Sequence, residues 1–136
     1  MKHVFGIFLA LFVVGGAYAV PARVSDIISG DKILMVASLD GGDEAFVQIR
    51  LVNADAPELR DKCDSAKRTA KSAKERLASL MPIDSVVELK NVKKDMFTSR
   101  FFANVILPDG RDVGEILIKE KLGRAFDGVH RYSWCK

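Results

Sequence analysis

The chain has 136 residues, of which 49% are hydrophobic, and carries 21 lysines and arginines against 18 aspartates and glutamates. The length is that of a single domain, and no internal repeat or long low-complexity linker divides it. A net charge of +3 does not by itself mark a nucleic-acid-binding protein, so such a function would have to come from clustered charges.

The first 19 residues have the pattern of a secretory signal peptide. Lys2 gives a basic start, an apolar run follows from Val4 to Val14, and small residues end in Ala17-Tyr18-Ala19. The apolar run is shorter than the roughly 20 residues that a membrane helix needs. We therefore expect a mature domain over residues 20–136, secreted or periplasmic, with no stable membrane association after cleavage.

Cys63 and Cys135 are the two cysteines of the chain. An even count in a small exported domain favours a disulfide over a metal site or a catalytic thiol. Two reduced, buried thiols are the alternative, which suits an oxidising compartment less well.

Three strands are expected at the start of the mature domain. Residues 23–40 cluster apolar and β-branched side chains around Gly30-Asp31, which indicates two strands joined at a bend. Residues 41–52 then supply a Gly-Gly turn and a third strand.

A helix is expected to begin at Asp64 as N-cap and to end before Pro82. Its apolar residues recur at helical spacing, at Ala66, Ala70, Ala73, Leu77 and Leu80. The opposite face is basic, which most often means a solvated face and less often one that attracts phosphate; it carries Lys67, Arg68, Lys71, Lys74 and Arg76.

Two more strands are expected at 85–92 and 100–108, separated by the basic segment 90–94 and a polar connection at 95–99. Asp112 and Glu115 have the spacing of a capping box, which predicts a second helix packed through Val113, Ile116 and Leu117. The order of elements is compatible with an α+β fold, a five-stranded OB-fold β-barrel with two to three helices. Spacing alone does not separate this barrel from other α+β arrangements.

Carboxylates gather where the expected strands end. Asp31 follows the glycine bend, and Asp55 and Glu58 follow the third strand. An oxygen-only set without a neighbouring His or Cys suits a hard cation, Ca²⁺ or Mg²⁺. Pro57 biases Ala56 toward an extended backbone, which can aim the Ala56 carbonyl at the same ion. Ordinary turn chemistry is the alternative.

Arg50 lies between strand-forming residues, and an inward guanidinium needs an anionic partner. It either pairs with Asp55 or Glu58 or binds a phosphate.

Five separated motifs resemble the staphylococcal-nuclease-like (thermonuclease) family. They run in order across residues 22–135 as GDKILM, IRLVNADAPEL with the following Cys63, RFFANV, DGRDVGEILIKEKLGRAF and the closing WC. The resemblance implies an OB-type barrel and Ca²⁺-dependent hydrolysis of DNA and/or RNA, with Mg²⁺ or another divalent ion as alternative metals.

The resemblance also implies roles for individual residues. The metal ligands would be Asp31, Asp55 and the backbone carbonyl of Ala56. The catalytic residues would be Glu58 as general base and Arg50 and Arg100 as phosphate contacts. Cations stabilise the charge that builds on phosphoryl oxygens, and a carboxylate can take a proton from the attacking water.

Two stretches depart from the family pattern. Lys32 stands where the family usually has the threonine of D-G-D-T. Its ammonium would weaken metal binding if it pointed inward, or assist phosphate binding if it reached the substrate. The loop before Arg100 is one residue longer than the family's D-x-Y-G-R, with Phe97 in place of tyrosine, and Phe126 also stands where tyrosine is common.

We therefore expect an exported, monomeric nuclease of low sequence specificity. One alternative is an OB-fold module that binds single-stranded nucleic acid but cleaves it poorly. Another is a non-enzymatic domain that binds calcium only for stability. Asp43, Glu44 and Asp95 are interpreted as solvated turn residues, His130 as a surface or packing residue, and Trp134 as a packing residue.

Overall fold

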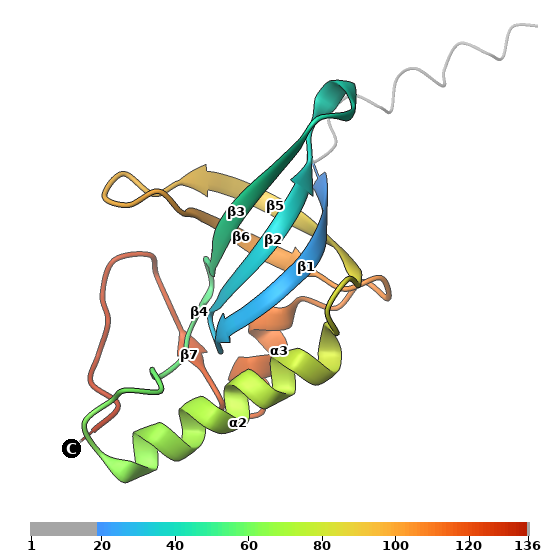
Figure 1. Cartoon of the computed structure of the whole chain (residues 1–136). Coiled ribbons are helices and arrows are strands. Elements are labelled where there is room, and N and C mark those ends of the chain that lie inside the picture. Colours follow the sequence, from blue (N-terminus) through green and yellow to red (C-terminus); the bar gives the residue numbers. More distant parts are fainter. Residues whose placement is uncertain (1–18, 136) are drawn as a thin grey trace, which may run out of the picture.

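A computed structural model describes residues 19–135, which form a closed barrel with helices at one end (Figure 1). The elements in chain order are β1 (Ala19–Ser29), β2 (Lys32–Ser38), the 3₁₀ turn η1 (Asp40–Gly42), β3 (Glu44–Leu51), β4 (Ala54–Asp55), α2 (Asp64–Leu80), β5 (Val86–Lys94), β6 (Phe101–Ile106), α3 (Val113–Lys119) and β7 (Arg124–Ala125). The predicted α+β class and five-stranded OB-type barrel are confirmed.

Residues 1–18 of the predicted signal peptide lie outside the described part of the chain, and Ala19 is the first residue of β1. Within the described range, no helix combines the length and the apolar character that crossing a bilayer requires.

The barrel closes in the order β1-β2-β3-β6-β5, and β5 pairs back onto β1. All neighbouring strands are antiparallel except β3 and β6, which run parallel. Arg50 on β3 is therefore paired with Lys32 on one side and with Phe102 on the other. Inward-facing apolar side chains fill the barrel, including Val24, Ile33, Met35, Leu51, Leu89 and Val105.

Helix α2 runs along the lower end of the barrel and packs its alanine face there (Figure 1). The predicted apolar face is confirmed for Ala66, Ala70, Ala73 and Leu77, which are all buried. Small side chains let the β1–β2 bend come close, since a Cβ at Gly30 would lie 2.6 Å from Ala73 Cβ and 2.8 Å from Ala56 Cβ. Glycine at position 30 therefore permits the close approach that brings Asp31 to the segment after β4.

Two predicted boundaries are wrong. The N-cap of α2 is Cys63, and Asp64 lies inside the first turn, where its negative charge suits the helix dipole. The basic segment 90–94 does not separate two strands, because β5 continues through Lys94 and pairs there with the start of β6. The cap of α3 is confirmed, because the Asp112 carboxylate accepts the Glu115 amide at 3.2 Å.

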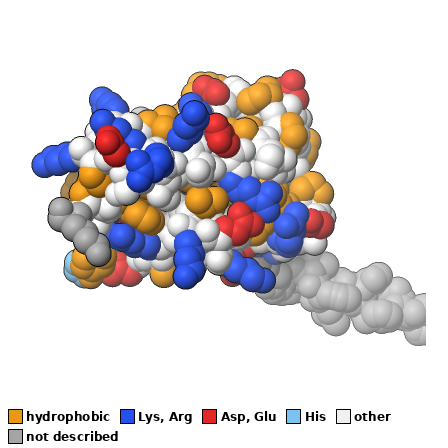
Figure 2. Space-filling model, turned by 90° about the horizontal axis from the view of Figure 1, so that it is seen from below, with side chains coloured by type: hydrophobic (Ala, Val, Ile, Leu, Met, Phe, Trp, Pro, Cys, Tyr) orange, Lys and Arg blue, Asp and Glu red, His pale blue; other side chains and the backbone are white. Residues whose placement is uncertain are grey.

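Figure 2 views the molecule from the side of α2 and shows Lys and Arg side chains spread over this face. Lys67, Arg68 and Lys71 of α2 are exposed. Arg76 is engaged instead, because its Nε and Nη2 each donate to Glu120 at 2.9 Å. The exposure of Lys67, Arg68 and Lys71 fits the interpretation of a solvated face.

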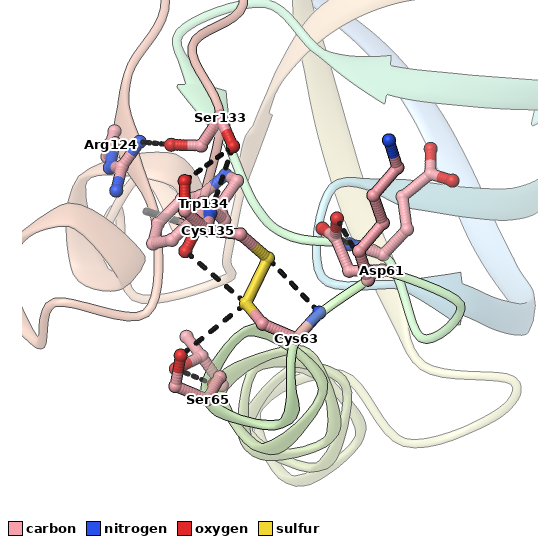
Figure 3. The surroundings of a disulfide bond; sticks show 10 residues. Asp61, Cys63, Ser65, Arg124, Ser133, Trp134 and Cys135 are labelled. Atoms are coloured by element: carbon pink, nitrogen blue, oxygen red, sulfur yellow. Dashed lines mark hydrogen bonds between the residues drawn. A yellow bond between two sulfur atoms is a disulfide. The ribbon is translucent and has the colours of Figure 1, made fainter.

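The predicted disulfide between Cys63 and Cys135 is present and ties the C-terminal tail to the start of α2 (Figure 3). Beside it, Arg124 donates to the Ser133 carbonyl at 2.9 Å and lies 3.8 Å from the centroid of the Trp134 ring. The tail, residues 127–135, is thus held at its far end against the segment that follows Glu58.

Removing this disulfide in the Cys63→Ser/Cys135→Ser variant is expected to lower the free energy of unfolding by about 2–4 kcal/mol. The bond restricts the unfolded chain, because the two cysteines are 72 residues apart. Urea denaturation measures the effect. A reducing agent should destabilise the wild-type protein by a similar amount and leave the variant unchanged, and equal stability of the two oxidised proteins would contradict the prediction.

Candidate active site

The charged residues singled out in the sequence meet where β2 begins and β3 ends. Asp31, Arg50 and Asp55 are 0%, 2% and 4% exposed, and the Glu58 side chain is at the rim with 39% of its surface exposed. Charges buried this deeply must be paired with one another or with a ligand.

Arg50 lies at the centre of this cluster. Its Nη1 donates to the carbonyls of Leu51 and Ala54, both at 2.7 Å. Its Nη2 donates to Asp55 Oδ1 at 2.9 Å and lies 3.6 Å from Asp31 Oδ2. Of the two interpretations left open by the sequence, pairing with the protein's own carboxylates is the arrangement found.

The guanidinium of Arg50 keeps its charge in this buried position. The ring of Phe126 covers it, with 4.4 Å between the guanidinium carbon and the ring centroid. Burial lowers the pKa of Arg50, and the negative charges of Asp31 and Asp55 oppose that change. An arginine in protein remains protonated throughout the physiological range.

Asp31 accepts hydrogen bonds on both of its oxygens. Oδ2 accepts the Ala56 amide at 2.8 Å, and Oδ1 accepts the Ser29 hydroxyl at 3.1 Å and the Lys32 ammonium at 3.2 Å. Burial raises the pKa of Asp31, but the charges of Arg50 and Lys32 together with the hydrogen bonds from Ala56 and Lys32 outweigh it and hold the pKa below its ordinary value. Asp31 is therefore an ionised, fully engaged carboxylate.

Lys32 points inward and bridges two carboxylates. Its Nζ lies 3.2 Å from Asp31 Oδ1 and 3.3 Å from Glu58 Oε2, and 14% of its side chain is exposed. The direction of this side chain could not be read from the sequence.

The tail supplies two further partners that the sequence did not reveal. Arg131 Nε donates to Asp55 Oδ1 at 2.8 Å, and its Nη1 lies 3.7 Å from Glu58 Oε2. Trp134 Nε1 donates to Asp55 Oδ2 at 3.2 Å, so this residue makes a polar contact in addition to the packing predicted for it. The pair of cysteines was the one sequence signal that could have placed the tail at this site, since a bond between Cys135 and Cys63 brings the tail close to Glu58.

Arg100 is held in a separate ion pair just before β6. Its Nε donates to Asp95 Oδ2 at 3.0 Å. Besides burial, which is the largest cause, the positive charges of Arg131 and Arg100 lower the pKa of Arg50. The Arg100 guanidinium carbon lies 5.9 Å from the ring centroid of Phe102, the residue that pairs with Arg50, although its direct partner is Asp95.

Asp95 is buried, at 6% exposure, so its interpretation as a solvated turn residue is wrong. It accepts the Phe97 amide and the Thr98 hydroxyl, both at 2.9 Å, in addition to Arg100. These hydrogen bonds, that of the Phe97 amide first, lower the pKa of Asp95. The longer loop before β6 is thus closed around one carboxylate that fixes Arg100.

Two pockets meet at Glu58. One of about 370 Å³ is lined by Glu58, Arg60, Asp61, Lys62, Arg131, Tyr132, Ser133 and Trp134. The other, of about 310 Å³, is lined by Ile28, Ser29, Lys32, Glu58, Leu59 and Arg60. An extended anion lying across both would pass Glu58 between cationic side chains.

The predicted metal ligands do not suit a divalent ion in this arrangement. Within residues 19–135, no three side chains of His, Cys, Asp or Glu are grouped so as to hold a metal ion. The anions Asp31, Asp55 and Glu58 are matched by the cations Lys32, Arg50 and Arg131. Ala56 meets Asp31 through its amide. A cluster without excess negative charge offers little attraction to Ca²⁺.

The barrel and the charged cluster at its strand ends define an OB-type α+β domain with paired charges at its rim. The sequence model of the family described as staphylococcal nuclease homologue matches residues 48–133, more than half of the chain. The chain belongs to this family of nucleases and nucleic-acid-binding proteins. The match includes Arg50, Asp55, Glu58, Arg100 and Arg131, while Asp31 and Lys32 precede it. No curated protein matches the chain with significant similarity.

Proposed function

We propose that the protein is an exported nuclease that hydrolyses phosphodiester bonds of DNA and/or RNA with low sequence specificity. One observation carries the proposal: Glu58 stands at the junction of two pockets, with Lys32 at 3.3 Å and Arg131 at 3.7 Å. A carboxylate can accept a proton, and the cations beside it can hold a phosphate in the same place. Family membership supports a nucleic acid as the ligand.

In the proposed reaction, Glu58 takes a proton from a water that attacks phosphorus. Both ion pairs of Glu58 engage Oε2, so we assign the proton transfer to Oε1. The new bond joins the water oxygen to phosphorus, one phosphorus–oxygen ester bond breaks, and the leaving oxygen takes a proton from solvent. Lys32, Arg100 and Arg131 stabilise the charge on the phosphoryl oxygens.

We assign Arg50 a positioning role. The Arg50 side chain is 2% exposed and binds Asp55 and two backbone carbonyls, which leaves little room for the phosphate contact that the family resemblance implies. By holding Asp31 and Asp55 it fixes the start of β2 against β4, and with them the segment that carries Glu58.

The dependence on Ca²⁺ remains a prediction from the family resemblance. A bound ion would polarise a phosphoryl oxygen and stabilise its charge. Since the carboxylates are already matched by cations, we assign no step of the reaction to a metal.

The proposal is tested by incubating the purified mature protein with plasmid, single-stranded DNA and RNA, in Ca²⁺, in Mg²⁺ and in chelator. Cleavage of any of these supports the nuclease. Binding that weakens with salt, without cleavage in any condition, would favour the OB-fold binding module instead. Absence of both would leave only a structural role.

Arg100→Ala is expected to lower the cleavage rate by about 10²–10³-fold, because one guanidinium that stabilises the phosphoryl charge is lost. Asp95→Asn should lower it less, since Arg100 remains but its ion pair is weakened. Arg111→Ala is the matched control, because Arg111 is exposed and pairs with Asp109. Initial rates on single-stranded DNA measure all three, and wild-type rates in Arg100→Ala would contradict the assignment.

A further inference from the structure

We propose that Lys32 supplies the cation of this site in place of a divalent metal ion. Its ammonium holds Asp31 and Glu58 together and faces the phosphodiester, so the protein neither binds Ca²⁺ at these carboxylates nor needs it for cleavage. The part that concerns cleavage rests on the proposed function, and the part that concerns metal binding does not.

The position of Nζ is that of a shared cation between two carboxylates. It lies 3.2 Å from Asp31 Oδ1 and 3.3 Å from Glu58 Oε2. Lys32 and Glu58 are 26 residues apart in sequence, and the Lys32 ammonium directly links the side chains of Asp31 and Glu58. A metal ion bridging the same two oxygens would have to displace this ammonium.

The ammonium also has capacity for a ligand. A lysine ammonium carries three donors, and the two carboxylates take two of them. Lys32 and Glu58 both line the pocket of about 310 Å³. A phosphate oxygen entering this pocket can therefore accept the third donor beside the proposed base.

The second predicted metal ligand is compensated as well. Asp55 accepts from Arg50 at 2.9 Å and from Arg131 at 2.8 Å, both on Oδ1, while Trp134 donates to Oδ2. A metal ion would need Asp31 and Asp55 together, and each already binds a cationic side chain. This arrangement disfavours a divalent ion through like-charge repulsion as well as through occupied ligands.

The presence of an ammonium in place of a metal ion has a chemical consequence. An ammonium stabilises negative charge on phosphoryl oxygens, but it does not bind a water and lower its pKa as a metal ion does. Activation of the water then falls to Glu58 alone. Cleavage should therefore persist in chelator and fall when Lys32 loses its charge.

The experiment compares the wild-type protein with Lys32→Gln and with Lys71→Gln, a matched control on the exposed face of α2. Each protein is stripped with chelator and titrated with Ca²⁺ by calorimetry and with Tb³⁺ by luminescence. Trp134 donates to Asp55 and can therefore sensitise an ion bound there. Cleavage of single-stranded DNA is measured in parallel, in chelator and in Ca²⁺.

We expect no saturable metal binding by the wild-type protein or by Lys71→Gln. Lys32→Gln should bind the ion saturably, at least about tenfold tighter than any residual weak binding by the wild-type protein, because removing Nζ leaves excess negative charge. If Lys32→Gln does not fold, Lys32→Met keeps the aliphatic stem and serves the same comparison. Wild-type cleavage that is equal in chelator and Ca²⁺ supports the catalytic part.

Two results would overturn the inference: saturable one-to-one binding of Ca²⁺ by the wild-type protein with Tb³⁺ luminescence from Trp134, or cleavage that chelator abolishes and Ca²⁺ restores. The proposed function fails in a different way, through absence of cleavage by wild-type protein in every condition. In that case the metal titrations still decide whether Lys32 replaces the ion.

Discussion

Replacing Glu58 with glutamine is expected to lower the rate of phosphodiester cleavage by about 10²–10⁴-fold, the usual contribution of a general base. Glutamine has nearly the same shape but cannot accept a proton from water at neutral pH. The Glu58 side chain is at the rim, 39% exposed, so its substitution leaves the barrel core untouched. Initial rates on single-stranded DNA and the midpoint of thermal unfolding are the two measurements.

The control for this experiment is Glu115→Gln, which removes one exposed carboxylate on α3. This variant should cleave single-stranded DNA at the wild-type rate. A thermal midpoint within a few degrees of wild type would show that Glu58→Gln is folded. Full activity in a folded Glu58→Gln protein would refute the role of Glu58, whatever the effect of Arg100→Ala.

Local pattern was enough to predict the strands of the barrel and both main helices, whereas the closed barrel itself was implied by the family resemblance. The bend at Gly30, the alanine spacing of α2 and the cap at Asp112 are each encoded within a few residues. The two-residue strands β4 and β7 were not predicted, because a pair of residues has no measurable period and their pairing joins segments 69 or more residues apart. The D-A-P-E motif likewise placed Asp55 and Glu58 correctly after β3, although Asp55 belongs to the unpredicted strand β4.

What the sequence did not reveal in the site is the set of long-range partners. The burial of Asp95 depends on how its loop closes, and no periodicity marks it. Arg131 looks like an ordinary tail residue until the disulfide brings it to Asp55. Lys32 was recognised as a departure from the family pattern, but the direction of its side chain depends on where Glu58 lies. These residues decide how much charge the site carries.

Arg50→Met should be the most destabilising of the single substitutions discussed, by about 3–5 kcal/mol, because breaking a buried ion pair leaves uncompensated charge inside the protein. Methionine fills a similar volume, so the loss reports mainly the lost ion pairs with Asp31 and Asp55 and the two lost carbonyl contacts. Arg124→Met is the control, because Arg124 is exposed and contacts the Ser133 carbonyl.

The pH dependence of this loss distinguishes a charge effect from a packing effect. In the wild-type protein the pKa of Asp31 is lowered, so its contribution to stability is present above its ordinary pKa of 3.8 and is lost as the pH falls through the folded-state value. Without Arg50, burial of Asp31 is less opposed and its pKa rises, so its carboxylate accepts a proton at a higher pH. The difference in unfolding free energy between wild type and Arg50→Met should therefore narrow between about pH 7 and about pH 3. Urea denaturation at several pH values measures this difference in unfolding free energy, and a constant difference would point to lost packing instead.

If Arg50→Met were as stable as wild type but bound DNA poorly, Arg50 would be a phosphate contact and its positioning role would be wrong.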